Sequence, residues 1–355
     1  MNKELVKNKF DRFKEIKKEL LDNKNDEKLN QELFDIVKDL KELSLKTFSK
    51  ESDFKKFLDN IGKFNNYSFN NQLLIALQKP DSKFVASFKT YKDLGYSVKS
   101  NPDSIKIIIP KEVVLVLDNR TNEIRYFNQL NEEEKQIYKD KNNNDIVYYS
   151  KKLVSFSLGT VFDITDSTMP FNEIENKLYP KLTDDNATLY IEVLEKIIKE
   201  NNYKLEYKKL SDKEGYCDMN NNKIVISEEL KSLSKLKVLV HELAHSLAHT
   251  NLKENYEEYK KDRSRYEVEA ESISYSVCKY FNLKVADDSS LYLYNYSKNK
   301  DFKEIDNSLN TITNISMKII KKINEKTKSL ENSKDIVLTN NTILENIKIR
   351  WRVKC

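Results

Sequence analysis

Apolar residues recur every three to four positions along much of this chain, a spacing that predicts amphipathic helices. Residues 3–22 and 27–46 show it amid dense charge and predict a helical hairpin. Pro80 ends a further predicted helix over 71–78, because proline cannot continue a helix. The same period predicts helices over 54–61, 189–200, 233–249, 265–278 and 302–328.

A second pattern, short runs rich in β-branched residues, predicts strands. In the first half these runs predict an antiparallel sheet, interrupted by a polar loop at 139–145. Two more runs, 203–208 and 223–226, precede the helix 233–249. We expect Lys223–Ser227 to be an edge strand to which an extended peptide adds as another strand. The runs of the first half cover 105–109, 113–117, 124–127, 146–149 and 153–162.

Composition and charge add limits. With 355 residues, 39% of them hydrophobic, the chain can fill two separate cores. Its net charge of +5 is too small to indicate a nucleic-acid partner by itself. The three cysteines are widely spaced and form no Cys-x-x-Cys pair, which favours reduced thiols. Because the chain has neither an apolar run of membrane length nor a signal-peptide pattern, we expect a cytoplasmic protein with no membrane partner.

Candidate chemistry concentrates in one predicted helix. All three histidines fall within nine positions, and His241, Glu242 and His245 form a His-Glu-x-x-His motif. Residues four apart lie on one helix face, about 6 Å apart along the axis, so both imidazoles can bind one cation. Glu242 stays close enough to act as general base on a water at that cation. This spacing is typical of zinc-dependent hydrolases.

The motif supplies two ligands, but a catalytic zinc site normally has three protein ligands and one open position. His249 lies too far from His241, since a separation of eight residues corresponds to about 12 Å along a straight helix. We expect His249 at the helix end, where a cationic side chain suits the helix dipole. A metzincin site is excluded because it would place a histidine where this chain has Asn251.

The next predicted helix, 265–278, supplies carboxylates. Glu267 and Glu271 are one turn apart on one face, so one can bind zinc while the other accepts the free ring N–H of a histidine ligand. We predict Glu267 as the ligand and Glu271 as its support, whereas Glu269 points to another side of the helix. An apolar face would dock this helix against the first one; its residues are Val268, Ala270, Ile273 and Val277.

This arrangement predicts amide hydrolysis at Zn²⁺. Glu242 would take a proton from water and pass it to the leaving amine. No histidine remains elsewhere in the chain to stabilise the oxyanion, so we expect a tyrosine or an arginine to do so. The candidates closest to the motifs in sequence are Tyr216, Tyr275 and Arg265.

These residues resemble a known family. Lys223–Ser227, Leu239–His249 and Tyr266–Val277 are similar to the metallopeptidase domain of ArdC-type and LtrC-like proteins of plasmids and other mobile elements. More distantly they resemble the ImmA/IrrE metallopeptidases. The resemblance implies a gluzincin-like zinc site on His241, His245 and Glu267.

The first half carries an independent resemblance, to the N-terminal single-stranded-DNA-binding domain of ArdC-like antirestriction proteins. It rests on residues 67–75, 88–95 and 162–167. Where such proteins have a turn rich in glycine and lysine, this chain has Ser100–Ser104, which removes positive charge. Residues 61–110 still combine seven lysines with aromatic residues, as binding of phosphates and bases requires. The DNA-binding candidates are Tyr67, Asn70, Asn71, Lys89, Tyr91, Lys92 and Lys99.

Together these observations predict an α+β fold with two domains and helical extensions. Residues 28–168 would form an ArdC-like domain with an antiparallel sheet, and 186–298 a zincin-like metallopeptidase domain around the His-Glu-x-x-His helix. A linker over 169–185 would join them. An N-terminal helical extension would cover 1–27, and an amphipathic helix with a tail would cover 299–355.

The resulting hypothesis is a zinc metallopeptidase coupled to single-stranded-DNA binding, acting in protection or transfer of mobile-element DNA. Its protein or peptide substrate is not identified by the sequence. Two alternatives stay open. One is a DNA-binding protective protein with a structural, non-proteolytic zinc site, and the other is an ImmA-like peptidase that cleaves a repressor.

Overall fold

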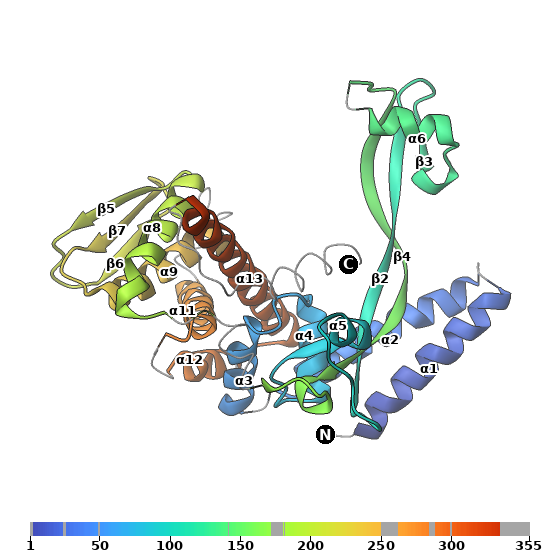
Figure 1. The fold of residues 1–355 in the computed structure, drawn as a ribbon, viewed down its shortest axis with the longest axis horizontal. Coiled ribbons are helices and arrows are strands. Elements are labelled where there is room, and N and C mark those ends of the chain that lie inside the picture. Colours follow the sequence, from blue (N-terminus) through green and yellow to red (C-terminus); the bar gives the residue numbers. More distant parts are fainter. Residues whose placement is uncertain are drawn as a thin grey trace. The chain divides into compact units, whose positions relative to one another are not determined.

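The computed structural model describes residues 3–23, 26–48, 50–140, 142–171, 180, 182–249, 262–283, 288–298 and 300–333 (Figure 1). It divides into two compact units, one of Met1–Lys41 with Lys106–Thr160 and one of Glu42–Ile105 with Val161–Cys355. Most of the predicted linker and the predicted tail after residue 333 lie outside the described residues. Within these ranges no helix is long and apolar enough to cross a membrane.

Two charged helices open the first unit, as the sequence predicted. α1 (Lys3–Asp22) and α2 (Glu27–Leu45) lie side by side (Figure 1). Arg12 of α1 donates two hydrogen bonds to the carboxylate of Glu32 in α2, at 2.7 and 2.8 Å. The apolar positions of both helices are buried, among them Phe13, Ile16, Leu33 and Leu40.

A long two-stranded ribbon with a small cap makes up the rest of this unit. β2 (Ser104–Asp118) and β4 (Ile146–Asp163) are neighbours, and each runs unbroken where the sequence predicted two shorter strands. Pro110 does not interrupt β2, because proline is tolerated where one strand edge is open. β3 (Glu123–Tyr126) pairs with the end of β2, and η1 (Phe127–Gln129) and α6 (Glu132–Lys139) complete the cap.

The second unit begins with short elements. These are α3 (Glu51–Ile61), α4 (Phe69–Gln78), β1 (Val85–Ser87) and α5 (Phe88–Asp93), with η2 (Ile164–Asp166) following β4. β1 pairs antiparallel with the end of β4, which completes a sheet of order β1-β4-β2-β3. Residues of α3 and α4 share one core with the helices that follow residue 183.

The second sheet has three strands, and their order contradicts one prediction made from the sequence. β5 (Lys204–Lys208), β6 (Gly215–Asp218) and β7 (Lys223–Ser227) stand in the order β5-β7-β6, with β5 parallel and β6 antiparallel to β7. The prediction that Lys223–Ser227 is an edge strand was therefore wrong. Its side chains from Ile224 to Ser227 are all buried, as a central strand requires. β6, which the sequence did not reveal, is the edge that contacts α9 (Ser232–Ala248).

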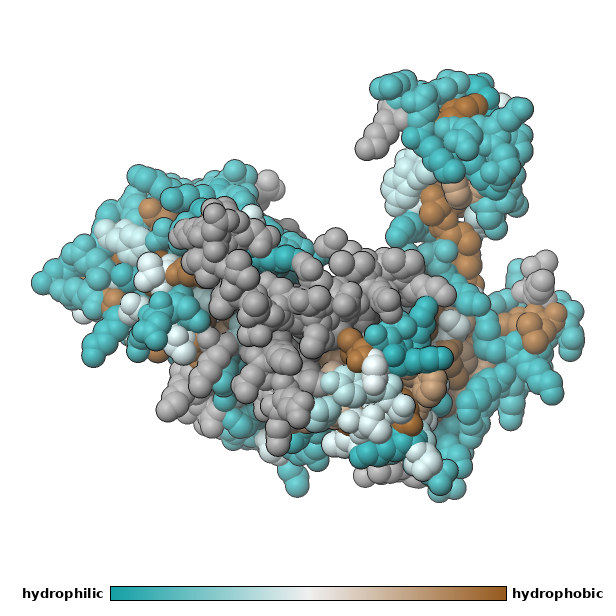
Figure 2. Space-filling view, viewed as in Figure 1, coloured by the Kyte–Doolittle hydropathy of each residue, from teal (hydrophilic) through white to brown (hydrophobic). Residues whose placement is uncertain are grey.

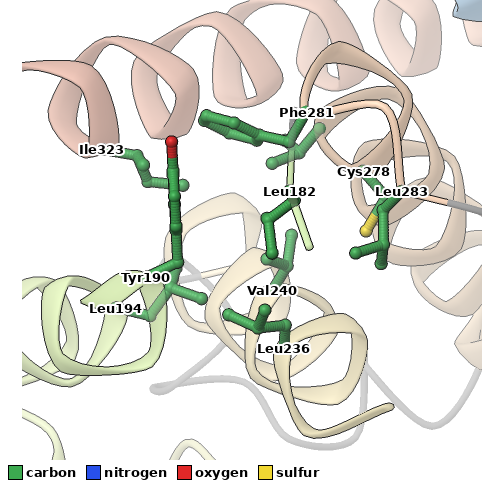
Figure 3. A pocket seen from close by; sticks show the side chains of 10 residues that line it. Leu182, Tyr190, Leu194, Leu236, Val240, Cys278, Phe281, Leu283 and Ile323 are labelled. Atoms are coloured by element: carbon green, nitrogen blue, oxygen red, sulfur yellow. The ribbon is translucent and has the colours of Figure 1, made fainter. Parts of the chain in front are cut away.

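α9 contacts the helices α8 (Asp184–Glu200), α11 (Arg263–Tyr280) and α13 (Phe302–Ser333). α12 (Asp288–Ser297) packs against α11 and α3. α11 packs against both α9 and α13, so its predicted apolar face does dock. A small apolar pocket lies among these helices, lined by Tyr190, Leu236, Val240 and Phe281 with other apolar side chains (Figure 3). Because no predicted site residue lines it, it is a packing gap in the core.

Candidate metal centre

The motif helix α9 is held by its apolar residues. Leu236, Leu239 and Leu243 are at most 2% exposed and belong to the main core. This packing turns the other side of α9 toward α11. The side chain of His241 is 21% exposed and that of His245 only 6%, so the first imidazole reaches solvent and the second is enclosed.

Three potential ligand atoms meet between α9 and α11. Nε2 of His245 lies 3.2 Å from Nε2 of His241 and 3.3 Å from Oε2 of Glu267. The third side of this triangle, from His241 Nε2 to Glu267 Oε2, measures 3.7 Å. Ligands bound tetrahedrally at the usual zinc distances of about 2.0–2.1 Å stand roughly 3.4 Å apart. The spacing of the triangle therefore fits one tetrahedral divalent cation.

Glu271 lies behind His241. Its Oε2 is 3.3 Å from Nδ1 of His241, and its Oε1 is 3.8 Å from Nζ of Lys237. Since Nε2 of His241 faces the triangle, the ring proton belongs on Nδ1, where it donates to Glu271. This geometry allows the supporting role predicted for Glu271.

The carboxylates make this centre attract positive charge. Burial alone lowers the pKa of His241, but hydrogen bonds with Glu267 and Glu271 outweigh it and raise the pKa to about 10. Hydrogen bonds from both histidines hold the pKa of Glu267 well below its usual range. Burial lowers the pKa of His245. The carboxylates of Glu267 and Glu271 thus favour positive charge at His241, which is what a cation site requires.

Glu242 stands beside the edge strand β6. It is 6% exposed, and burial raises the pKa of its carboxyl to about 7. The backbone N–H of Cys217 in β6 donates to this carboxyl and acts in the opposite direction. A group whose pKa lies near the working pH can both accept and release a proton, which suits a general base.

The register between β6 and β7 determines which backbone groups of β6 face away from β7. The N–H of Ser227 in β7 donates to the carbonyl of Glu214 at 2.8 Å. In an antiparallel pair such bonds involve every second residue. Tyr216 is therefore a residue bonded to β7, whereas the backbone groups of Gly215 and Cys217 face away from β7. Among the residues that the structure describes, no second strand pairs with this edge of β6.

Of the predicted oxyanion donors, two have other partners. The hydroxyl of Tyr275 donates to Asp59 at 2.7 Å and accepts from Lys55 at 3.3 Å, and this side chain is 1% exposed. Nε of Arg265 donates to Glu269 at 2.8 Å. Tyr216 is half-buried in β6, with Nζ of Lys213 3.9 Å from its ring centroid. Tyr216 is consequently the candidate that we retain.

The change Tyr275→Phe tests this choice. We expect it to lower the free energy of unfolding by about 1–2 kcal/mol, because it removes a hydrogen bond within the packed interior and leaves Asp59 without its donor. We expect the rate of any peptide cleavage to stay unchanged. Tyr216→Phe should do the reverse, slowing cleavage while changing stability by less than about 0.5 kcal/mol. Urea unfolding and cleavage rates of both variants distinguish the roles; slow cleavage by a fully stable Tyr275→Phe protein would contradict this choice.

The predicted DNA-binding residues fall into two groups. Tyr67, Asn71 and Tyr91 are buried, at 6%, 8% and 0% exposure. The hydroxyl of Tyr67 donates to the carbonyl of Val85, and that of Tyr91 to the carbonyl of Phe162. The structure therefore places these three in the protein core, where they cannot stack on bases, and we no longer assign them to DNA. The exposed candidates are Asn70, Lys89, Lys92 and Lys99.

Sequence reasoning missed an exposed aromatic and basic segment on β4. Tyr148 and Tyr149 are 55% and 54% exposed, and Lys151 and Lys152 follow them at the surface. Figure 2 shows apolar residues exposed along the ribbon that β2 and β4 form. Exposed rings next to lysines are the groups that stack on bases and contact phosphates. The signal was the run Tyr-Tyr-Ser-Lys-Lys at residues 148–152, of which only the two tyrosines belonged to a predicted strand.

Two known protein domains match segments of this chain, one in each half. Residues 27–162 match the N-terminal domain of anti-restriction factor ArdC, and residues 191–283 match the IrrE N-terminal-like domain of the M78 peptidases. An uncharacterized protein of Bacillus anthracis is 26% identical over 330 residues, covering 88% of this chain and 54% of that protein. The chain thus spans about half the length of this curated relative.

Two crystal structures of antirestriction protein ArdC from plasmid R388 are among the solved structures that resemble this chain. The metal-free structure is 12% identical, with a TM-score of 0.40, over 74% of this chain and 86% of that one. The Mn(II)-bound structure is 13% identical, with the same TM-score, over 74% of this chain and 85% of that one.

Proposed function

Because this chain joins an ArdC-type N-terminal domain to an IrrE-like domain of the M78 peptidase family, we propose that it is a zinc-dependent metallopeptidase coupled to single-stranded-DNA binding. One observation carries the peptidase part, the triangle of 3.2, 3.3 and 3.7 Å formed by His241, His245 and Glu267. We expect both activities to act in the protection or the transfer of mobile-element DNA.

The donor set favours zinc. Two imidazoles and one carboxylate at tetrahedral spacing suit Zn²⁺, whereas Mn²⁺ prefers more oxygen ligands in an octahedron. When bound, zinc polarises the scissile carbonyl and makes water more acidic. We therefore expect one zinc per chain in elemental analysis of protein purified without chelator. Protein that contains no metal, and takes none up, would remove the basis of the peptidase proposal.

A catalytic rather than structural role is supported by the openness of the site. Structural zinc sites have four protein ligands, but among the described residues the metal-binding group comprises His241, His245 and Glu267 alone. Glu267 is 42% exposed, so one side of the triangle faces solvent. Glu242 would accept a proton from water there and pass it to the leaving amine.

The edge strand β6 supports a peptide as substrate. The outward backbone groups of Gly215 would pair with an extended peptide, placing its main chain alongside Glu242. Such a peptide would be recognised mainly through its backbone, so its side chains would matter little for binding. Incubating the protein with a cell extract and labelling new amino termini would identify the peptide bonds that it cleaves.

The DNA part is supported by the ArdC-type domain and by the exposed lysines. We expect Lys89→Glu combined with Lys92→Glu, both on α5, to weaken binding of a single-stranded oligonucleotide at least tenfold. If each lysine neutralises one phosphate of the single strand, the slope of log affinity against log salt should also fall by about 1.4 in this variant. Mobility shifts at several salt concentrations measure both quantities.

Controls for this experiment come from the same chain. Lys196→Glu with Lys199→Glu makes the same change of charge on the exposed face of α8 and should leave affinity unchanged. Tyr148→Ala with Tyr149→Ala tests the ribbon, where each stacked base contributes about 1–3 kcal/mol. If the wild-type protein binds duplex and single strands equally, or the α8 variant is as weak as the α5 variant, the single-strand proposal fails.

A further inference from the structure

The third histidine, His249, lies outside the ligand triangle but directly behind it. Its Nδ1 is 3.3 Å from Nδ1 of His245, and its Nε2 is 3.2 Å from Oε2 of Glu269. The side chains of His249 and Glu269 are each only 2% exposed. The three imidazoles thus form a row that leads from the ligand triangle into the protein interior and ends at the carboxylate of Glu269, which was not predicted as a site residue.

Two further side chains, one from α11 itself and one from α13, hold this carboxylate in place. Nε of Arg265 donates to Oε1 of Glu269 at 2.8 Å, and the Oγ hydroxyl of Ser308 in α13 donates to the same oxygen at 2.7 Å. Because a guanidinium and a hydroxyl both donate to Oε1, Glu269 serves as a hydrogen-bond acceptor here, and its Oε2 faces Nε2 of His249.

One arrangement of ring protons satisfies every contact in this line. If Nε2 of His245 serves as a ligand, its ring proton is on Nδ1 and points at His249. Two N–H groups cannot face each other, so Nδ1 of His249 must accept, and its own proton is then on Nε2. That proton donates to Glu269. Given ligation by Nε2 of His245, the tautomers of both rings follow from the hydrogen bonds.

We propose that His249 and Glu269 are positioning residues that fix the orientation and tautomer of His245, as Glu271 does for His241. The inference rests on the proposed metal centre and deepens it. Both ligand imidazoles would then be oriented by buried or half-buried carboxylates, His241 directly and His245 through a second ring. Through Ser308, the line also connects the centre to α13, which lies outside the segment that matches the IrrE-like domain.

Two substitutions of similar size separate positioning from simple packing. The side-chain oxygen of asparagine can take the place of the acceptor Nδ1 of His249, whereas the side-chain NH2 of glutamine can take the place of the donor Nε2. His249→Asn should keep the hydrogen bond to His245 and hold zinc within about threefold of wild-type affinity. His249→Gln loses this bond and should bind zinc about 10–100-fold more weakly, the range typical when the partner of a histidine ligand is removed. Competition with a chromogenic chelator measures both affinities.

A direct reading of the tautomers needs no variant. The chain has only three histidines, so protein labelled with ¹⁵N-histidine gives two ring-nitrogen signals from each of them. In the zinc-loaded protein, long-range ¹H–¹⁵N correlations should show the proton of His245 on Nδ1 and that of His249 on Nε2. A proton on Nδ1 of His249, or equal zinc affinity of the Asn and Gln variants, would overturn the inference. Absence of zinc binding by the wild-type protein would instead refute the metal centre itself.

Discussion

Replacing Glu242 with Gln is expected to slow peptide cleavage by about 10²–10⁴-fold, the usual contribution of a general acid–base group. The amide has nearly the shape of the carboxyl but cannot take a proton from water. Zinc affinity should stay unchanged because Glu242 is not one of the three grouped ligands. DNA affinity should also stay unchanged, since the exposed DNA candidates lie on other segments of the chain.

Thermal stability gives this variant an internal control. The pKa of Glu242 is raised to about 7, above its value in an unfolded chain, so the folded state holds this proton more tightly. The stability due to that proton is present at acidic pH and is lost as pH rises through about 7. At pH 8, metal-free Glu242→Gln protein should therefore melt no lower than metal-free wild type.

The outcome separates the three functional hypotheses. New amino termini that appear in an extract with the wild type but not with Glu242→Gln identify peptidase activity. A single cleaved repressor, with no effect of single-stranded DNA, would favour the ImmA-like alternative. If the variant and wild type behave alike in every assay, the zinc site only supports the fold and the peptidase proposal is wrong.

Sequence alone predicted the elements that carry the centre because their pattern is local. The apolar period of α9 and α11 places His241, His245 and Glu267 on defined helix faces whatever the rest of the chain does. The one tertiary step, docking of the two helices, followed from the apolar face of α11. Local geometry of this kind therefore predicted the three side chains that the structure brings together.

The predictions that failed concern side chains whose neighbours in the fold are far away in the sequence. Tyr91 donates to Phe162 and Tyr275 to Asp59, partners far away in sequence, and no local pattern indicates that such rings are buried. β6 is only four residues long and contains glycine, so its strand signal was too weak to detect. Without β6, β7 was taken for an edge. Glu269 was set aside on helix geometry alone, because its partners His249 and Ser308 become neighbours only in the folded chain.

Removing the carboxylate ligand is expected to have the second large effect. Structural zinc sites contribute about 10–16 kcal/mol from four ligands, or about 3 kcal/mol for each ligand. Glu267→Ala should therefore weaken zinc binding by roughly 100–1,000-fold. At a zinc concentration of about 100 times the wild-type Kd, the metal should stabilise the wild type by about 2.7 kcal/mol and the variant hardly at all.

The series Glu267→Ala, Glu271→Ala and Glu192→Ala makes this prediction specific. Glu271 contacts the outer nitrogen of His241, so its loss should cost about 10–100-fold in affinity, less than the loss of a ligand. Glu192 pairs with Lys196 at 2.9 Å on α8 and should have no effect on zinc. Calorimetric titration and melting curves, each with and without zinc, measure the series. Equal losses for Glu267 and Glu271 would mean that the cation is not held by the triangle, because only direct ligation makes one carboxylate matter more than the other.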